Sequence, residues 1–208
     1  MPHTILHINT SPMGERSVSR QLGVKVLAEL QARFPGSTLV TRDLAAKPLP
    51  HLSATTLGAF FTPAEQRTPE LVAAAAESDA AIAELKAADI IVIGAPMWNF
   101  GIPSALKAWI DHVCRAGQTF KYGANGPEPL IEPGKKVIIV SSRGGVYSAG
   151  PMSAMDFQED YLRSVLGFIG LRDVSFVRAE GVAMGEAAAK SAMQAAETHL
   201  AQTVEALA

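Results

Sequence analysis

Three short segments of the chain have an apolar centre made of isoleucine, valine or leucine. They read HTILHIN at residues 3–9, DIIVIGA at residues 89–95 and KVIIVSS at residues 136–142. A strand with one face in solvent alternates apolar and polar residues, whereas a parallel strand covered by helices on both faces is apolar throughout. The three segments therefore predict the central strands of a parallel sheet that is buried between two helical layers.

Two further segments, TLVTRD at residues 38–43 and DVSFVRA at residues 173–179, alternate more strongly and predict strands nearer the sheet edges. Amphipathic helical patterns separate the strands and follow the last one. These patterns cover residues 17–34, a segment opening at Thr68-Pro69-Glu70, a segment opening at Pro103-Ser104, residues 153–169 and residues 185–207.

Strand and helix alternate through five rounds, which is typical of a doubly wound α/β fold. With right-handed crossovers, we predict a five-stranded parallel sheet in the flavodoxin-like order 2-1-3-4-5. No linker or repeat divides the chain, so residues 1–208 are predicted to form a single domain. Residues 118–134 break the alternation with an Asn125-Gly126 turn and three prolines, and they predict a small hairpin insertion that projects from the sheet edge like a lid.

Composition and charge exclude several classes of protein. Of the 208 residues 48% are hydrophobic, which is enough for one sizeable core. The formal net charge is −2 and no run of basic residues occurs, so a nucleic-acid partner is not expected. The longest apolar runs have the length of strands, and we expect neither a signal peptide nor a membrane span.

The single cysteine, Cys114, rules out an internal disulfide and favours a reducing compartment, so we predict a cytoplasmic protein. We interpret Cys114 as a packing residue because it ends an apolar-faced helix. The five histidines lack the spacing of zinc ligands, so no metal site is predicted. No Ser-His-Asp arrangement, carboxylate pair or cysteine nucleophile is evident, and no side chain is predicted to be catalytic.

The loop after the first strand, NTSPMGERSVSR at residues 9–20, gathers hydroxyl groups where a helix begins. Ser11, Ser17 and Ser19 would join the free N–H groups of the helix start in binding an anion. The alternative is that Ser17 or Ser19 merely caps the helix. The loop lacks both the G-x-G-x-x-G pattern and the P-loop lysine, so it favours a mononucleotide phosphate over a dinucleotide or ATP.

The loop after the third strand, GAPMWNFGIPS at residues 94–104, holds large side chains between glycines and prolines. A flat heterocycle needs apolar surfaces for its faces and main-chain N–H groups for its polar edge. Met97, Trp98, Asn99 and Phe100 provide such a lining. The alternative is that the aromatic residues pack into the core, which suits Trp98 alone better than the whole set, because Asn99 would be a poor core residue.

The loop after the fourth strand, SSRGGVYSAGP at residues 141–151, allows close approach of the backbone to a ligand at Gly144-Gly145. Arg143 would assist an anion or would be exposed without a specific role. Together the three loops predict a ligand with a phosphate at one end and a flat ring at the other, and FMN meets that description. The cofactor would then carry the redox chemistry.

Four motifs sharpen this prediction: SPMGERSVS near the start, PMWNFGIPSALKAWID in the middle, SSRGG after the fourth strand and LGFIG at residues 166–170. In order and spacing the chain resembles the FMN-dependent NADH-azoreductase family of flavodoxin-like quinone reductases. The position of Trp98 is often tyrosine in that family, so the bulkier ring would alter the pocket here.

The resemblance implies a role for each matching residue. FMN phosphate would be held by Ser11, Ser17, Val18 and Ser19, its ring would be lined by Met97, Trp98, Asn99 and Phe100, and its pyrimidine edge would be met by Ser142, Arg143, Gly144 and Gly145. The resemblance also implies a homodimer with active sites at the subunit interface. By the same analogy Phe168, Phe120 and Tyr122 would face the substrate pocket.

We therefore predict an oxidoreductase that uses NADH or NADPH to reduce quinones and azo compounds by two-electron, ping-pong hydride transfer. The alternative is a flavodoxin-type electron carrier without small-molecule turnover. Such carriers use strong charge to steer their protein partners, and a net charge of −2 supplies little. A lid formed by residues 118–134 would also suit an enclosed pocket better than an open flavin edge.

Overall fold

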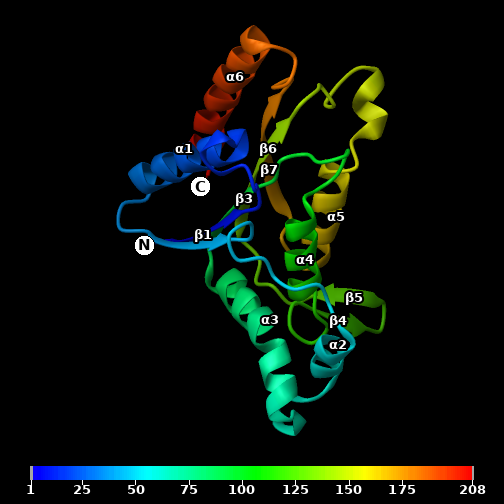
Figure 1. Cartoon of the computed structure of the whole chain (residues 1–208). Helices are drawn as coiled ribbons and strands as arrows, with labels where there is room; N and C mark the ends of the chain where they lie inside the picture. The colour runs from blue at the N-terminus through cyan, green and yellow to red at the C-terminus, as the bar shows by residue number, and fades with distance from the viewer. Residues whose placement is uncertain (1, 208) are drawn as a thin grey trace.

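The computed structural model describes residues 2–207, and its centre is a five-stranded parallel sheet in the order β2-β1-β3-β6-β7 (Figure 1). This is the predicted order 2-1-3-4-5 when only the strands of this sheet are counted, and the two alternating segments form its edges. The strands are β1 (Thr4–Asn9), β2 (Thr38–Asp43), β3 (Ile90–Gly94), β6 (Lys136–Arg143) and β7 (Asp173–Glu180).

Helices cover both faces of the sheet, as expected for a doubly wound fold (Figure 1). One face is covered by α1 (Val18–Arg33) and α6 (Glu186–Glu205), and the other by α3 (Pro69–Ala87), α4 (Ser104–Val113) and α5 (Glu159–Phe168). The smaller elements are α2 (Ala54–Phe61) and the 3₁₀ helices η1 (Gly14–Arg16), η2 (Ala64–Gln66) and η3 (Pro151–Met155).

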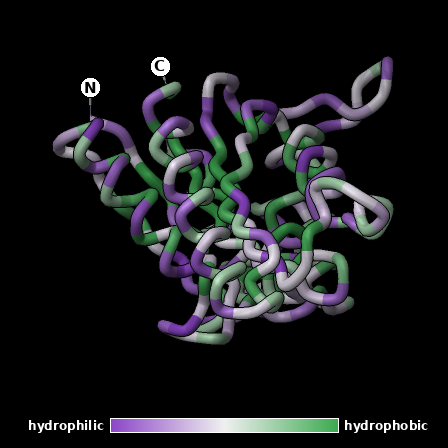
Figure 2. Tube along the Cα trace, turned by 90° about the horizontal axis from the view of Figure 1, so that it is seen from above, coloured by the Kyte–Doolittle hydropathy of each residue, from purple (hydrophilic) through white to green (hydrophobic). Residues whose placement is uncertain are grey.

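The alternation of side chains along each strand divides the core into two layers. On β6, Ile138 and Val140 pack toward α1 and α6, whereas Val137 and Ile139 pack toward α3, α4 and α5. Figure 2 shows the hydrophobic segments gathered in the interior of the molecule. None of the helices within residues 2–207 is long and apolar enough to cross a membrane.

Two helix predictions need correction. The α-helix predicted over residues 153–169 begins only at Glu159, and Pro151–Met155 form the 3₁₀ helix η3 instead. Oδ1 of Asp156 accepts hydrogen bonds from the N–H groups of Gln158 and Glu159 and so fixes the start of α5. The helix α2 was not predicted, although Ser53 caps it by accepting a hydrogen bond from the N–H of Thr56. By contrast, Thr68 caps α3 as predicted.

The insertion is an antiparallel hairpin of β4 (Phe120–Gly123) and β5 (Gly126–Pro129). It follows the end of α4 and precedes β6, so it lies at the amino edge of the sheet, near the end of α5 (Figure 1). The N–H of Ile131 donates to the carbonyl of Ile169 there, at 3.3 Å. The predicted hairpin is therefore present, and within one chain it lies away from the carboxyl edge of the sheet.

His7 is the one titratable side chain of β1 on the face that α1 covers. Its ring is only 4% exposed, and Gly23 of α1 leaves room for it, because a Cβ at Gly23 would lie 3.1 Å from Nε2. Burial, helped by the charge of Arg20, lowers the pKa of His7 from 6.5 to about 4. His7 is therefore neutral in the folded protein throughout the physiological range.

This burial predicts a pH-dependent contribution to stability. In the unfolded chain His7 takes up a proton as the pH falls below 6.5, but in the folded chain it does so only near pH 4. The free energy of unfolding should therefore fall by roughly 3 kcal/mol from this residue between pH 7 and pH 4. Urea denaturation across this range should show a shallower pH slope for His7→Leu than for the wild type. Equal slopes would contradict the assignment.

Candidate functional site

Three loops meet at the carboxyl edge of the sheet, after β1, β3 and β6. The strand order reverses between β1 and β3, because the chain leaves β1 toward β2 on one side and later returns to β3 on the other. In open parallel sheets this is the place where ligands bind. Main-chain bonds hold two of the loops together, since the N–H of Met97 donates to the carbonyl of Ser142 at 2.8 Å.

The first loop ends in the start of α1 and offers a cluster of hydrogen-bond donors. Ser17 caps the helix by accepting from the N–H of Arg20, and its Oγ lies 3.1 Å from Oγ of the buried Ser19. Within residues 2–207 no hydrogen bond engages the N–H groups of Val18 and Ser19. Capping and anion binding are compatible here, because a cap satisfies only one of the donors.

A cavity of about 190 Å³ adjoins these donors. It is lined by Ser11, Met13, Arg16, Ser17, Val18, Pro96, Met97, Trp98, Ser142, Gly144 and Val182. Hydroxyl groups, unpaired N–H groups and a helix start are the donors that a phosphate group accepts from. The residues present therefore fit the phosphate end of FMN. Arg16 adds a positive charge at the rim, and the sequence analysis did not single it out.

A second arginine fixes the first loop in place. Arg20 donates from Nε to the carbonyl of Ser11 at 3.0 Å, and both of its terminal nitrogens bind Asp43 at the end of β2, at 2.7 and 2.8 Å. The hydrogen bonds from Arg20 hold the pKa of Asp43 below its ordinary value. This forked ion pair links the first loop to the neighbouring strand.

The second loop is a tight turn with two left-handed residues. Trp98 and Gly101 exchange two main-chain hydrogen bonds of 3.0 Å, and between them Asn99 and Phe100 have φ angles of 47° and 70°. Asparagine tolerates this conformation, whereas a left-handed phenylalanine costs roughly 1–2 kcal/mol. Strain of this kind in a loop at a ligand edge points to a functional constraint.

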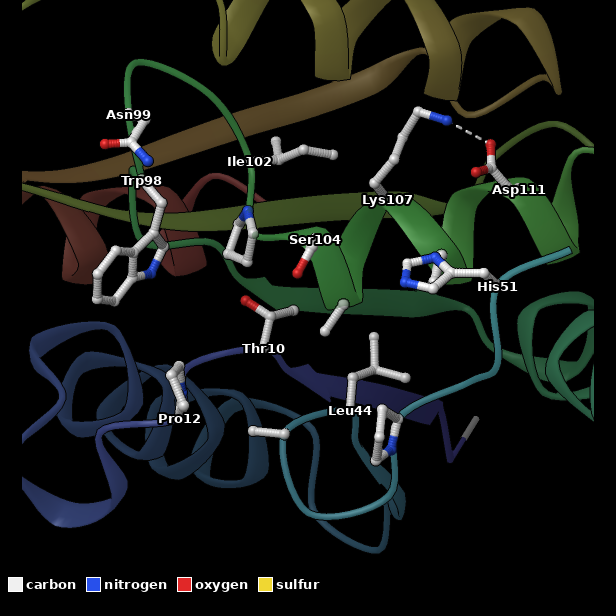
Figure 3. Close-up of a pocket in the computed structure, with 15 residues that line it drawn as sticks. Thr10, Pro12, Leu44, His51, Trp98, Asn99, Ile102, Ser104, Lys107 and Asp111 are labelled. Carbon is white, nitrogen blue, oxygen red and sulfur yellow. Dashed lines mark hydrogen bonds and ion pairs between the residues drawn. The ribbon is translucent and has the colours of Figure 1, made fainter.

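The side chains of this turn remain accessible. Trp98 is 46% exposed and Asn99 is exposed, while Met97 and Phe100 are half-buried. The alternative that Trp98 belongs to the core is therefore wrong. Figure 3 shows the Trp98 and Asn99 side chains at the rim of a cavity, held out by the turn.

That second cavity has a volume of about 770 Å³ and lies between α4 and the loop after β2 (Figure 3). Leu44, Ile102 and Ala108 contribute apolar surface, and Lys107 and Asp111 form an ion pair of 2.6 Å at one side. It shares Trp98 with the phosphate-sized cavity, so this indole separates the two spaces.

The third loop places only some of its predicted residues toward the ligand. Ser142 and Gly144 line the smaller cavity. Arg143 points to the opposite face of the sheet and is fully buried, where its guanidinium binds Asp156 at 2.9 Å, Glu159 at 2.6 Å and Glu180 at 3.1 Å. The predicted contact between the Arg143 side chain and FMN is therefore corrected to a structural ion-pair role.

Glu180 stabilises the remainder of this loop. Its carboxylate accepts hydrogen bonds from the N–H groups of Tyr147 and Ser148 and from the Ser148 hydroxyl. Burial alone would raise the pKa of Glu180, but these hydrogen bonds and the charge of Arg143 lower it below its ordinary value. The backbone beyond Gly145 is thereby held in one conformation.

The predicted substrate residues form a separate aromatic cluster. The ring of Phe120 lies 4.5 Å from that of Phe168 and 5.5 Å from that of Tyr122, between ring centroids. All three lie at the amino edge, because the hairpin and the end of α5 are there. One chain alone therefore does not bring them to the loops at the carboxyl edge.

The cysteine and the candidate metal ligands of the described residues do not indicate nucleophilic or metal-dependent catalysis. Burial raises the pKa of the Cys114 thiol to about 11, which keeps it protonated and a poor nucleophile. In the part of the chain that the structure describes, no three histidine, cysteine or acidic side chains are grouped as metal ligands.

Comparisons with known proteins agree with this geometry. A family model described as flavodoxin-like fold matches residues 3–204. A protein of Herminiimonas arsenicoxydans named FMN-dependent NADH:quinone oxidoreductase is 58% identical over 181 residues, which is 87% of this chain and 88% of that protein. A protein of the same name from Paraburkholderia phymatum is 54% identical over 198 residues, or 95% and 98% of the two chains.

Solved structures lead to the same family. The crystal structure of an azoreductase from Bacillus anthracis strain Sterne has a TM-score of 0.88 and 31% identity, covering 98% of this chain and 99% of that one. An FMN-dependent NADH-azoreductase from Bacillus anthracis strain Ames Ancestor, solved in complex with FMN, has a TM-score of 0.89 and 25% identity over 99% of both chains. The chain therefore belongs to the flavodoxin-like family of FMN-dependent NADH-azoreductases and quinone reductases.

Proposed function

We propose that the protein is an FMN-dependent oxidoreductase that uses NADH to reduce quinones and azo compounds. The observation that carries this proposal is the pairing of a phosphate-sized donor cluster with a strained, aromatic turn at the same sheet edge. The names of the relatives support the donor and the quinone, and the names of the structural neighbours support azo reduction.

In this proposal each loop has a distinct task. Ser11 and Ser17, which line the smaller cavity, hold the phosphate together with the N–H groups of Val18 and Ser19. Ser19 also contributes its hydroxyl, which lies 3.1 Å from that of Ser17. The turn from Met97 to Phe100 supports the ring, and the segment from Ser142 to Gly145 meets its pyrimidine edge through main-chain groups. Residues 1–208 then act as one FMN-binding domain, and a reducing cytoplasmic setting suits the single cysteine.

FMN, when bound, supplies two-electron redox chemistry that no side chain here provides. The chain's own residues bind and orient the reactants, and main-chain donors near Asn99 and Gly144 stabilise negative charge on the ring edge. We propose a ping-pong order in which the donor and then the acceptor use the same open side of the turn beside Trp98. No acidic or basic side chain is required at the reacting atoms, so protons come from solvent.

The electron-carrier alternative has less support. The net charge of −2 provides little steering for a protein partner. The relatives, at 46–58% identity, are named as oxidoreductases that use NADH and quinone. We therefore favour turnover of small molecules over electron shuttling.

We further propose that the active protein is a homodimer whose sites include residues of both subunits. The aromatic cluster of Phe120, Tyr122 and Phe168 lies at the opposite sheet edge from the phosphate-binding loop, so a second copy is needed to bring the two together. Tyr122 is 75% exposed, and Phe61 and Phe168 are also exposed. Solvent-exposed aromatic side chains of this kind are typical of an interface.

The first prediction of the proposed function concerns the cofactor and turnover. Purified protein mixed with FMN should retain the flavin through gel filtration, turn yellow and oxidise NADH when a quinone is present. A colourless protein would contradict the FMN assignment. A yellow protein that transfers no electrons from NADH to quinone would instead favour the electron carrier.

The second prediction isolates the phosphate site. Ser17→Ala combined with Ser19→Ala should weaken FMN binding by about 100-fold, because each substitution removes a hydroxyl group that donates a hydrogen bond to the charged phosphate. Binding of riboflavin, which lacks the phosphate, should change little. Fluorescence titration measures both constants. Thr68→Ala removes a comparable helix cap from α3 and serves as the control for stability alone. Equal losses for FMN and riboflavin would contradict the phosphate assignment.

The third prediction tests the shared site. Phe168→Ala should raise KM for the quinone, and the chain carrying both serine substitutions should be inactive at FMN concentrations that saturate only the wild type. The two variant chains are then denatured and refolded together. About one quarter of all sites should then be of wild type, because half of the dimers contain one chain of each kind and one of their two sites is unmodified. Such a site combines the serine loop of one chain with the aromatic cluster of the other. Failure to recover a site with wild-type KM would contradict a site built from both subunits.

A further inference from the structure

We infer that residues 156–159, DFQE, form a clamp that holds the turn at Trp98–Gly101 and the third loop in their ligand-binding shapes, with Gln158 as its central positioning residue. The inference rests on the proposed FMN site, and nothing in the comparisons assigns a role to these residues. Each of the four residues contacts one of the two loops or a strand that carries them.

Gln158 connects the ends of two strands. It is fully buried, its Nε2 donates to the carbonyl of Ala95 at 3.0 Å, and its Oε1 accepts from the hydroxyl of Ser141 at 2.8 Å. Ala95 lies three residues before Trp98, and Ser141 lies directly before the ligand-facing Ser142. A buried amide with both ends satisfied fixes the spacing of its partners, because losing either bond leaves a polar group unpaired.

Phe157 holds the strained turn through its main chain. Its N–H donates to the carbonyl of Phe100 at 3.1 Å, and Phe100 is the residue with φ of 70°. Phe100 also packs edge-on against Tyr147 of the third loop, with ring centroids 6.1 Å apart. A left-handed phenylalanine persists only where its surroundings determine its conformation, and these two contacts do so.

The charged members of the clamp extend it to the third loop. Asp156 and Glu159 bind the buried Arg143. The Nε of Arg143 donates to the hydroxyl of Ser141 at 3.0 Å, and this hydroxyl in turn donates to Gln158. Arg143 in turn pairs with Glu180, which accepts from the N–H groups of Tyr147 and Ser148. A continuous hydrogen-bonded network therefore runs from Ala95 to Ser148.

The network lies on the opposite face of the sheet from the ligand, so it acts through the backbone. Ser141 and Arg143 point toward α5, whereas Ser142 points toward the cavity. The clamp supports the two loops assigned to the ring and makes no contact with Ser17 or Ser19. Loosening it should therefore affect retention of the ring and leave intact the contacts that Ser17 and Ser19 make with the phosphate.

The test uses the full-length protein and two ligands, FMN and riboflavin. Gln158→Ala should weaken binding of both by the same factor, about tenfold, because the loss is at the ring that both ligands share. The visible circular dichroism of bound FMN should also change, since it reports how the ring is held. This pattern is the opposite of the one expected for the serine pair, which affects FMN alone.

Ser78→Ala is the matched control. Ser78 is also buried and donates to a main-chain carbonyl, that of His112 at 2.7 Å, near the end of α4 remote from the turn. It should lower thermal stability without changing either dissociation constant. A merely structural role for Gln158 predicts the same outcome for Gln158→Ala, and that result would overturn the inference.

A milder substitution covers the case in which Gln158→Ala fails to fold. Ser141→Ala removes the hydroxyl that Gln158 accepts from, and it should weaken FMN and riboflavin equally by a few fold. Where both single variants fold, the double variant should bind about as weakly as Gln158→Ala alone, because the two residues belong to one network. Unchanged binding by Ser141→Ala, or fully additive losses, would overturn the inference. Failure of wild-type protein to bind either flavin would instead overturn the proposed function.

Discussion

The reversal of strand order between β1 and β3 is the constraint on which the rest of the site depends. It places the start of α1 and the Trp98–Gly101 turn side by side at one sheet edge, although 80 residues separate them along the chain. The N–H groups of Val18 and Ser19 can then face the same ligand as the indole of Trp98. Without this arrangement the serine loop would be an ordinary helix start and the turn an ordinary loop.

Rigid charge networks on both sides of this edge keep the loops in place. Arg20 and Asp43 link the first loop to β2, and Arg143 with its three carboxylates links the third loop to α5. Arg20 and Arg143 therefore hold the backbone of the loops in place. The ligand-facing surface therefore consists mainly of hydroxyl groups, main-chain N–H groups and apolar side chains, with Arg16 at its rim, which suits a cofactor that performs its own redox chemistry.

Much of the fold could be predicted from the sequence because buried parallel strands have a distinctive composition. The runs at Thr4–Asn9, Ile90–Gly94 and Lys136–Arg143 form the three central strands of the sheet, and the loops that follow them contain the candidate site. The role of Arg143 could not be predicted, because its partners are 13 to 37 residues away and lie on the face opposite to Ser142. The position of Phe120 and Phe168 depends on the path of α4 and α5 across the sheet, which composition does not reveal.

The start of α5 could have been predicted from the sequence, since Asp156 and Glu159 have the spacing of a capping box. The contacts of Gln158 could not be predicted, because its partners are main-chain and hydroxyl groups that are distant in the sequence.

The most direct test of the account is a crystal structure of the protein with FMN bound. We expect the phosphate within hydrogen-bond distance of the Val18 and Ser19 N–H groups, and the ring against the Trp98–Gly101 turn with Asn99 and Phe100 still left-handed. A phosphate bound elsewhere, or a turn that relaxes to ordinary backbone angles when the ring binds, would contradict it.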